Sequence, residues 1–370
     1  MKKLQQLFER IVQRVNINLR ELEYDVQVDI AAHPVDTSEG QMSFDEYLES
    51  DHSTAMAVVI LHKGKIAFER YPRMRAYEKP IYWSVAKILP ATLLRIMEEN
   101  GELDVDQAID FYIPELSNSA FKGTTVRNIL DMASGLDCED EYEDRTSCYY
   151  QYSAAIGDGY RSEDSAANPY DFLKSLTASR HAPQGSVFSY SGVNTFILGW
   201  LVEALSGQPL QDVLSQTIWS KIGAEADASF VAYHSGIPLA HGGFLARPRD
   251  LARFGLLFTP SYKVVSDKAL ISTTHIRFLQ SGGRPRLLRN AGLAKDNPAG
   301  IRHNVYQWDH VYHNGTLYKG GWAGQGLIIN PDKDVVAVFA SYFKDEAHSE
   351  QALEPVVFDV INSVFELELN

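Results

Sequence analysis

The chain has little of several features that would decide its class at once. It has two cysteines, Cys138 and Cys148, among 370 residues. That number is too small for a disulfide framework, so we expect two reduced thiols, with a local disulfide as the alternative in an oxidising compartment. No apolar run approaches the roughly 20 residues that cross a bilayer. Nor does an apolar stretch follow Met1-Lys2-Lys3, so we expect a cytoplasmic protein without a signal peptide or membrane partner.

Basic charge is also scarce. Lys and Arg number 34 against 48 Asp and Glu, which gives a formal charge of −14. A surface of this sign repels phosphate backbones and anionic lipids, so nucleic acid is not an expected partner. The 11 histidines contain no His-Glu-x-x-His pattern, and His303, His310 and His313 have no carboxylate at ligand spacing. We therefore expect neither a metal nor another cofactor. The Gly-x-Ser-x-Gly elbow of α/β-hydrolases is absent as well.

Hydrophobic residues make up 45% of the chain, which is enough for a large core. Apolar spacing predicts an amphipathic helix over 3–22 and a C-terminal helix over 348–365. Strand-like runs flank Lys63-Gly64 and again flank 331–333, so each of these turns should close a hairpin.

Between these ends the chain is mainly helical. Helices are predicted over 126–132, 194–205 and 248–258. The acidic, tyrosine-rich stretch 138–170 has no regular period, and a loop of that length is expected to be functional. We expect its part 138–160 to cover the cleft and set specificity.

Together these elements predict an α+β fold. One antiparallel sheet would be built from both termini and flanked by helices, with a helical lobe inserted. We expect one domain, with a sheet lobe of about 1–83 and 262–370 and a helical lobe of about 84–261. The site should lie between the lobes.

The strongest candidate for chemistry is the segment Ser84–Lys87, with the sequence Ser-Val-Ala-Lys. It opens an apolar stretch that ends near Gly101, and residues three apart on a helix are neighbours. A serine hydroxyl needs a nearby base to become a nucleophile, and a buried lysine can serve. Two other Ser-x-x-Lys matches, Ser119…Lys122 and Ser341…Lys344, do not open an apolar helix.

Two further segments carry suitable side chains. Tyr190, in Tyr-Ser-Gly before an apolar helix, can act as a second proton carrier. Lys319-Gly320-Gly321 runs into Trp322, and its small residues would let a substrate lie along the strand. There the backbone N–H of Trp322 could point at an oxyanion, while Lys319 could hold a substrate anion and lower the pKa of a neighbouring amine.

In order, these three segments resemble the motifs of the penicillin-recognising serine hydrolases, with the layout of the class C β-lactamase-like branch. The resemblance extends over roughly residues 55 to 345 and includes the segments 125–136 and 242–255. It implies a β-lactamase/transpeptidase-like fold. It also implies catalysis by Ser84, Lys87 and Tyr190, with the oxyanion held by the backbone N–H groups of Ser84 and Trp322.

The second motif departs from the family pattern at Gly192, where β-lactamases carry an asparagine. Asn194 lies two residues on. The third motif is closer to family VIII carboxylesterases and 6-aminohexanoate-dimer hydrolase.

The resemblance therefore predicts a serine hydrolase that acts through an acyl-enzyme on small esters or amides. Its substrate contacts would come from Lys319, Gly320, Gly321, Asn194 and Gln325. A β-lactamase or D-alanyl peptidase is the alternative, and a catalytically silent binding protein is the alternative of another class. Whether Lys87 or Tyr190 takes the first proton stays open at this point.

Overall fold

A computed structural model describes residues 20–141, 143–232, 236–293, 300–344 and 353–367. The helix expected over 3–22 lies almost wholly outside these described residues. None of the described helices is long and apolar enough to cross a bilayer.

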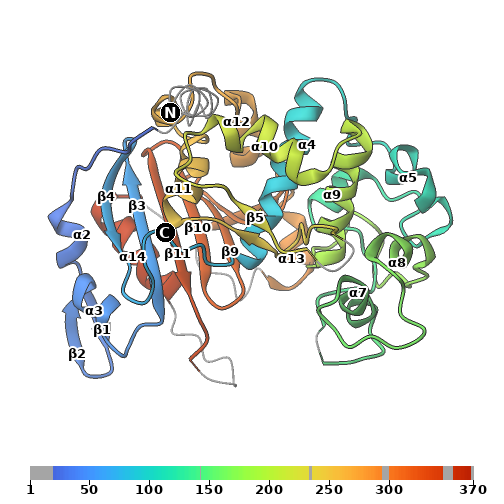
Figure 1. Ribbon diagram of the computed structural model, residues 1–370, viewed down its shortest axis with the longest axis horizontal. Helices are drawn as coiled ribbons and strands as arrows, with labels where there is room; N and C mark the ends of the chain where they lie inside the picture. The colour runs from blue at the N-terminus through green and yellow to red at the C-terminus, as the bar shows by residue number, and fades with distance from the viewer. Residues whose placement is uncertain (1–19, 142, 233–235, 294–299, 345–352, 368–370) are drawn as a thin grey trace, which may run out of the picture.

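A seven-stranded antiparallel sheet forms the centre of the fold, in the order β4-β3-β11-β10-β9-β8-β7 (Figure 1). Its strands are β3 (Ala55–His62), β4 (Lys65–Arg70), β7 (Ile301–Val305), β8 (Trp308–Tyr312), β9 (Leu317–Gly321), β10 (Gln325–Asn330) and β11 (Val335–Ser341). Both expected hairpins are present, β3 with β4 and β10 with β11. Because β3 pairs with β11, strands from both ends of the chain join one sheet. This confirms the predicted α+β, β-lactamase/transpeptidase-like fold.

Both faces of the central strands are buried. Val59 and Val338 enter one apolar cluster, whereas their neighbours Val58 and Phe339 enter another. Side chains alternate across a strand, so one sheet can separate two cores. This explains why these strands have continuous apolar sequences instead of an alternating pattern.

The smaller core lies under α14 (Leu353–Phe365), the C-terminal helix predicted over 348–365. The N-terminal elements of this core are α2 (Val28–Ala32), β1 (Pro34–Thr37), β2 (Gly40–Ser43) and α3 (Phe44–Glu49). Ser43 caps α3 in a capping box with Glu46, which fixes where that helix begins.

The larger core joins the other face of the sheet to the helical part of the chain, on the right of Figure 1. Its elements up to residue 206 are η1 (Trp83–Lys87), α4 (Ile88–Glu99), α5 (Ile109–Tyr112), η2 (Pro114–Asn118), α6 (Val126–Leu130), α7 (Cys148–Ile156), α8 (Pro169–Ser175) and α9 (Gly192–Ser206). The later ones are α10 (Leu210–Thr217), η3 (Trp219–Lys221), β5 (Ser229–Phe230), β6 (Phe244–Leu245), α11 (Pro248–Leu256), η4 (Pro260–Val264) and α12 (Thr273–Ser281). The short helix α13 (Arg286–Asn290) follows α12 in the chain and is not part of this core. Helices α6, α9 and α11 match the ranges predicted near 126–132, 194–205 and 248–258.

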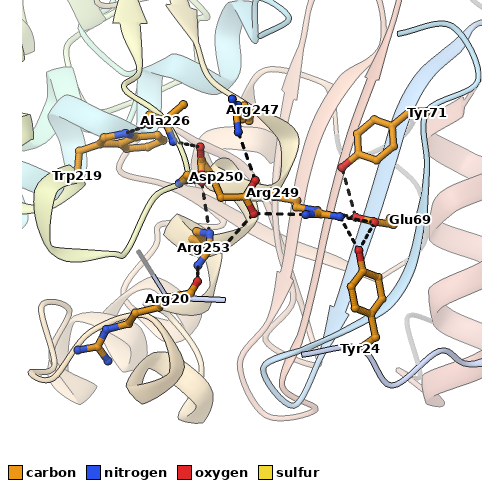
Figure 2. Close-up of polar contacts among 11 residues, drawn as sticks. Arg20, Tyr24, Glu69, Tyr71, Trp219, Ala226, Arg247, Arg249, Asp250 and Arg253 are labelled. Atoms are coloured by element: carbon orange, nitrogen blue, oxygen red, sulfur yellow. Dashed lines mark hydrogen bonds and ion pairs between the residues drawn. The ribbon is translucent and has the colours of Figure 1, made fainter. Parts of the chain in front are cut away.

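Helix α11 is fixed to the sheet by a polar network (Figure 2). Arg249 donates to both oxygens of Glu69 on β4, at 2.5 and 2.8 Å. Asp250 accepts the backbone N–H groups of Glu225 and Ala226 at 2.7 and 3.1 Å. At Gly255 a Cβ would lie 2.5 Å from Val336 of β11, so only glycine permits this close packing. The charged residues of this segment therefore have a structural role.

The segment after residue 137 differs from expectation in two ways. Cys138 and Cys148 form a disulfide, so the prediction of two reduced thiols is wrong. The segment also contains α7, which sequence periodicity did not reveal. Ser147 caps its N-terminus, and Gly157, with a φ of 87°, ends it. The loop is therefore held by a covalent link and a capped helix.

Candidate active site

The predicted nucleophile, Ser84, lies in the 3₁₀ helix η1 and not in the α-helix that the sequence led us to expect. Three residues make one turn of a 3₁₀ helix, so positions 84 and 87 lie directly above one another. Trp83, just before Ser84, has a φ of 40°, a strained conformation for a bulky residue. The chain turns sharply there, and α4 then continues as a regular helix from Ile88.

Lys87 is buried and its amine contacts Ser84. The Nζ atom donates to the Ser84 Oγ at 3.0 Å and to the backbone carbonyl of His241 at 2.7 Å. Burial lowers the pKa of the Lys87 amine to about 7; the carboxylate of Asp140 opposes this shift, while the nearby Lys319 adds to it. A large share of the Lys87 amine is therefore neutral near pH 7 and able to accept a proton.

Tyr190 lies against both lysines. The Nζ atoms of Lys87 and Lys319 each lie 5.0 Å from the centroid of its ring. The amine of Lys319 also donates to the Tyr190 hydroxyl at 3.2 Å. The structure thus brings together Ser84, Lys87 and Tyr190, the three side chains predicted from the sequence to be catalytic.

These segments meet at a cavity of about 480 Å³. Its lining residues are Ser84, Asp140, Phe188, Tyr190, Leu288, Leu293, Asp309, His310, Tyr318, Gly320, Gly321, Trp322 and Glu354. A larger cavity of about 820 Å³ lies among residues 137–179 and is lined by none of the three predicted catalytic residues. We therefore regard the smaller cavity as the candidate active site.

Strand β9 forms one wall of this cavity. Gly320 and Gly321 both line it, and a Cβ at Gly321 would lie 2.7 Å from the backbone oxygen of Tyr82. The glycine thus lets β9 approach the segment that carries Ser84. The rings of Trp83 and Trp322 lie 5.3 Å apart, edge to face, and close the same junction. Ser84 and Trp322 both face the cavity, as the predicted oxyanion site requires; that role remains a prediction.

Lys319 helps to lower the pKa of Lys87, as predicted, but its pairing differs from the expected role of holding a substrate anion. Its side chain is fully buried, and its Nζ pairs with the Asp309 Oδ1 at 2.5 Å. Burial lowers the pKa of Lys319, and Asp309 opposes that shift. The amine is thus already paired with a carboxylate before any substrate anion arrives.

Two predicted substrate contacts do not reach the cavity. Asn194 is buried in α9, and its amide donates to the Met132 sulfur at 3.7 Å. Gln325 is also buried, and its side chain bonds the backbone of Ser341 on β11. Both amides are used in holding the fold together, so their prediction as binding residues is not supported by their positions.

Asp140 is a site residue that sequence reasoning missed. Its Oδ1 accepts the backbone N–H of Gly192 at 2.6 Å, and a Cβ at Gly192 would lie 3.4 Å from the same oxygen. A carboxylate from the disulfide-linked segment therefore lies beside the position where related enzymes carry an asparagine. Two neighbouring bonds hold it there, from Ser189 to Glu139 at 2.7 Å and from Ser191 to the Cys138 carbonyl at 2.5 Å.

Replacing Asp140 with Asn should shift the pH dependence of activity. The Asp140 carboxylate favours the charged form of Lys87, so its removal lowers the pKa of Lys87 further below about 7. If neutral Lys87 is the base, the acidic limb of kcat/KM moves to lower pH in D140N, while the amide oxygen still accepts from Gly192. Glu141→Gln, one residue away at an exposed position, is the matched control and should leave the limb in place. An unmoved limb in D140N would contradict coupling between the two groups.

No group of three or more His, Cys, Asp or Glu side chains within the described ranges could hold a metal ion. His310 lines the cavity, and burial lowers its pKa. His241, behind Lys87, is buried with its pKa well below the usual value, and its ring bonds the Tyr152 hydroxyl at 3.1 Å. Both imidazoles are therefore neutral near pH 7.

The sequence model of the Beta-lactamase family matches residues 42–361. The chain belongs to this family. It is 27% identical over 290 residues to the 6-aminohexanoate-dimer hydrolase of Paenarthrobacter ureafaciens, covering 78% of this chain and 73% of that protein. Family membership confirms the resemblance to the penicillin-recognising serine hydrolases.

Solved structures agree. A candidate 6-aminohexanoate-dimer hydrolase from Bacillus anthracis superposes with a TM-score of 0.77 at 25% identity, over 95% of this chain and 89% of its own. A class C β-lactamase shares the fold with a TM-score of 0.59 at 16% identity, over 86% and 94% of the two chains. The protein is thus a β-lactamase-fold hydrolase whose relatives include amide hydrolases and β-lactamases.

Proposed function

We propose that this protein is a serine hydrolase that acts on small carboxylic esters or amides through an acyl-enzyme at Ser84. The observation that carries the proposal is the contact of 3.0 Å between the Lys87 Nζ and the Ser84 Oγ, made by an amine whose pKa is lowered to about 7. A nucleophile bonded to a base at neutral pH is the arrangement that covalent catalysis needs.

In the proposed mechanism, the neutral Lys87 amine takes the hydroxyl proton as the Ser84 oxygen attacks the substrate carbonyl. The backbone N–H groups of Ser84 and Trp322 stabilise the oxyanion. Tyr190, held between the two lysines, carries the proton to the leaving group. Water then attacks the ester of Ser84 while Lys87 accepts a proton from it. As the acid leaves, Lys87 returns this proton to the Ser84 oxygen, to which its amine is bonded, and the free enzyme is restored. Because the charge of Lys319 acts on Lys87, the two amines titrate as a coupled unit.

Esters and amides rank above β-lactams as substrates. The family's asparagine amide, which holds the acylamide group of a β-lactam, is replaced here by Gly192, and Asn194 lies buried elsewhere. A similar protein, from Paenarthrobacter ureafaciens, is named a 6-aminohexanoate-dimer hydrolase, and a bond between an amine and a carboxylic acid is an amide, which favours the same ranking. Hydrolysis of a β-lactam or a D-alanyl peptide is the second candidate, and family membership is what supports it. We propose small-molecule substrates only. The Cys138–Cys148 disulfide favours an oxidising compartment over the cytoplasmic location expected from the sequence.

The proposal predicts that a covalent adduct forms on Ser84. Intact-mass measurement across a panel of p-nitrophenyl esters, small amides and β-lactams should show an acyl mass increase with esters, and a fluorophosphonate probe should label the same residue. The expected order of turnover is ester, then amide, then nitrocefin. Turnover of nitrocefin as fast as an ester would reverse the substrate ranking.

The same experiment separates an enzyme from a binding protein. Ser84→Ala is the control, because it should lose both the adduct and the label. If the unaltered protein shows neither adduct nor label with any member of the panel, the fold serves binding alone and the proposed mechanism is wrong.

A further inference from the structure

The charges around the candidate active site are unequal. Among the described residues that line the cavity are three carboxylates, from Asp140, Asp309 and Glu354, and no lysine or arginine. His310 is the remaining titratable base there, and burial lowers its pKa. The wall that a substrate meets is therefore acidic, as is the whole chain, with its formal charge of −14.

The two lysines of the site lie behind this wall. Lys87 is 1% exposed and is bonded to Ser84 and to the His241 carbonyl. Lys319 is 0% exposed and is bonded to Tyr190 and Asp309. Neither amine is presented to the cavity as a free cation.

Asp309 occupies the position that a substrate carboxylate would need. It lies on β8 next to His310, which pairs with Tyr318 of β9, so Asp309 faces Lys319 across the two strands. Its Oδ1 lies 2.5 Å from the Lys319 Nζ, and its Oδ2 accepts the Gly320 N–H at 3.0 Å. Asp309 also lines the cavity. One carboxylate thus takes both the cation and a backbone donor of the strand along which a substrate would lie.

We infer that Asp309 is a specificity-determining residue. Because its carboxylate is already bonded to Lys319 and Gly320, these two groups are not available to bind a substrate anion. Substrates that carry a carboxylate beside the scissile bond are therefore excluded. This inference rests on the proposed hydrolase function and names its substrate class. Uncharged or cationic esters and amides are accepted. An anionic substrate is rejected because it must displace an internal carboxylate from a buried ion pair while approaching Glu354.

The test compares kcat/KM within matched sets of esters. One set has a p-nitrophenyl leaving group and an acyl chain that ends in a methyl group, a carboxylate or a trimethylammonium group. A second set consists of phenyl acetates with a carboxylate, its methyl ester or a trimethylammonium group on the ring. The unaltered protein should prefer the neutral and cationic members over the carboxylate by about tenfold or more in at least one set.

Asp309→Asn should reduce that preference by about tenfold, because kcat/KM for the carboxylate esters rises. The asparagine oxygen can still accept from Gly320, while Lys319 becomes available to an anion. The gain should be larger at mildly acidic pH, because a buried Lys319 without Asp309 holds its proton less well. In Asp309→Asn with Lys319→Met, the gain should disappear.

Asp332→Asn is the matched control, since it removes an exposed carboxylate at the far end of the β10–β11 hairpin and should leave the preference unchanged. Equal losses on all esters in D309N would mean a structural role and would overturn the inference, as would an unaltered protein that prefers carboxylates. Hydrolysis of the neutral ester, sensitive to Ser84→Ala, reports the proposed function separately.

Discussion

Replacing Ser84 with Ala should lower ester hydrolysis by about 10⁴-fold or more while leaving the protein folded. The loss is large because Ser84 is the one serine among the described residues that line the cavity, and the remaining donors and base cannot compensate for a missing nucleophile. The hydroxyl is partly exposed and accepts one hydrogen bond, from Lys87. Its removal should cost about 1 kcal/mol of unfolding free energy. Steady-state kinetics with a p-nitrophenyl ester and a thermal melt measure the two effects.

Ser119→Ala is the matched control for this substitution. Ser119 also lies three residues before a lysine, but its hydroxyl donates to the Leu116 carbonyl at 2.9 Å, away from the cavity lining. It should retain nearly full activity. If S84A kept activity within tenfold of the unaltered protein, with the substitution verified by mass, another residue would be the nucleophile.

The three segments of the site could be predicted from the sequence because each combines a reactive side chain with a local constraint. Ser84 and Lys87 share a short turn before a buried helix, so their contact needs only local geometry. Gly320 and Gly321 indicate a close backbone approach, and the structure shows Tyr82 as the partner at Gly321. Both predicted hairpins follow from their turn residues, whereas the order of all seven strands was not predicted.

The residues that were missed depend on contacts between distant segments. Asp140 is one of several acids in its loop, and which acid enters the site is decided by the disulfide and by bonds to residues 189–192. Nothing local marks it.

The pairing of Asp309 with Lys319 did have a signal. Asn314-Gly315 is a favoured turn between strands, although a two-residue turn there would place position 309 opposite 320. The observed register of β8 and β9 pairs His310 with Tyr318 and so places 309 opposite 319.

Asn194 and Gln325 show the opposite error. Both lie within a few residues of a motif, and proximity in sequence made them candidates. Asn194, however, lies in the first turn of α9 with its side chain buried in the core, and in β10 the side chain of Gln325 bonds the neighbouring strand. Closeness to a motif along the chain therefore identified the right segment, but it did not show toward which side of the helix or strand each side chain points.

Removing the amine of Lys87 should have an effect nearly as large as losing Ser84. Lys87→Met keeps a buried, unbranched side chain and removes the one amine bonded to the Ser84 hydroxyl, so we expect kcat/KM to fall by about 10³-fold or more. The melting temperature should change little, because two effects oppose each other. Burying an apolar group in place of an amine stabilises the fold, whereas the loss of the donor to the His241 carbonyl destabilises it. Lys122→Met is the control. It changes the exposed lysine of the Ser119…Lys122 match and should be fully active.

A base and a merely structural lysine can then be distinguished by rescue. Lys87→Ala leaves space for a small primary amine, and adding methylamine or ethylamine should restore part of the activity, with a rate that rises with amine concentration and with pH as the added amine loses its proton. The unaltered protein, by contrast, should lose activity as the pH falls through about 7, where Lys87 takes up its proton. A Lys87→Ala protein that stays folded, is not rescued and keeps the pH limb of the unaltered protein would show that another group, with Tyr190 the first to test, accepts the proton of Ser84.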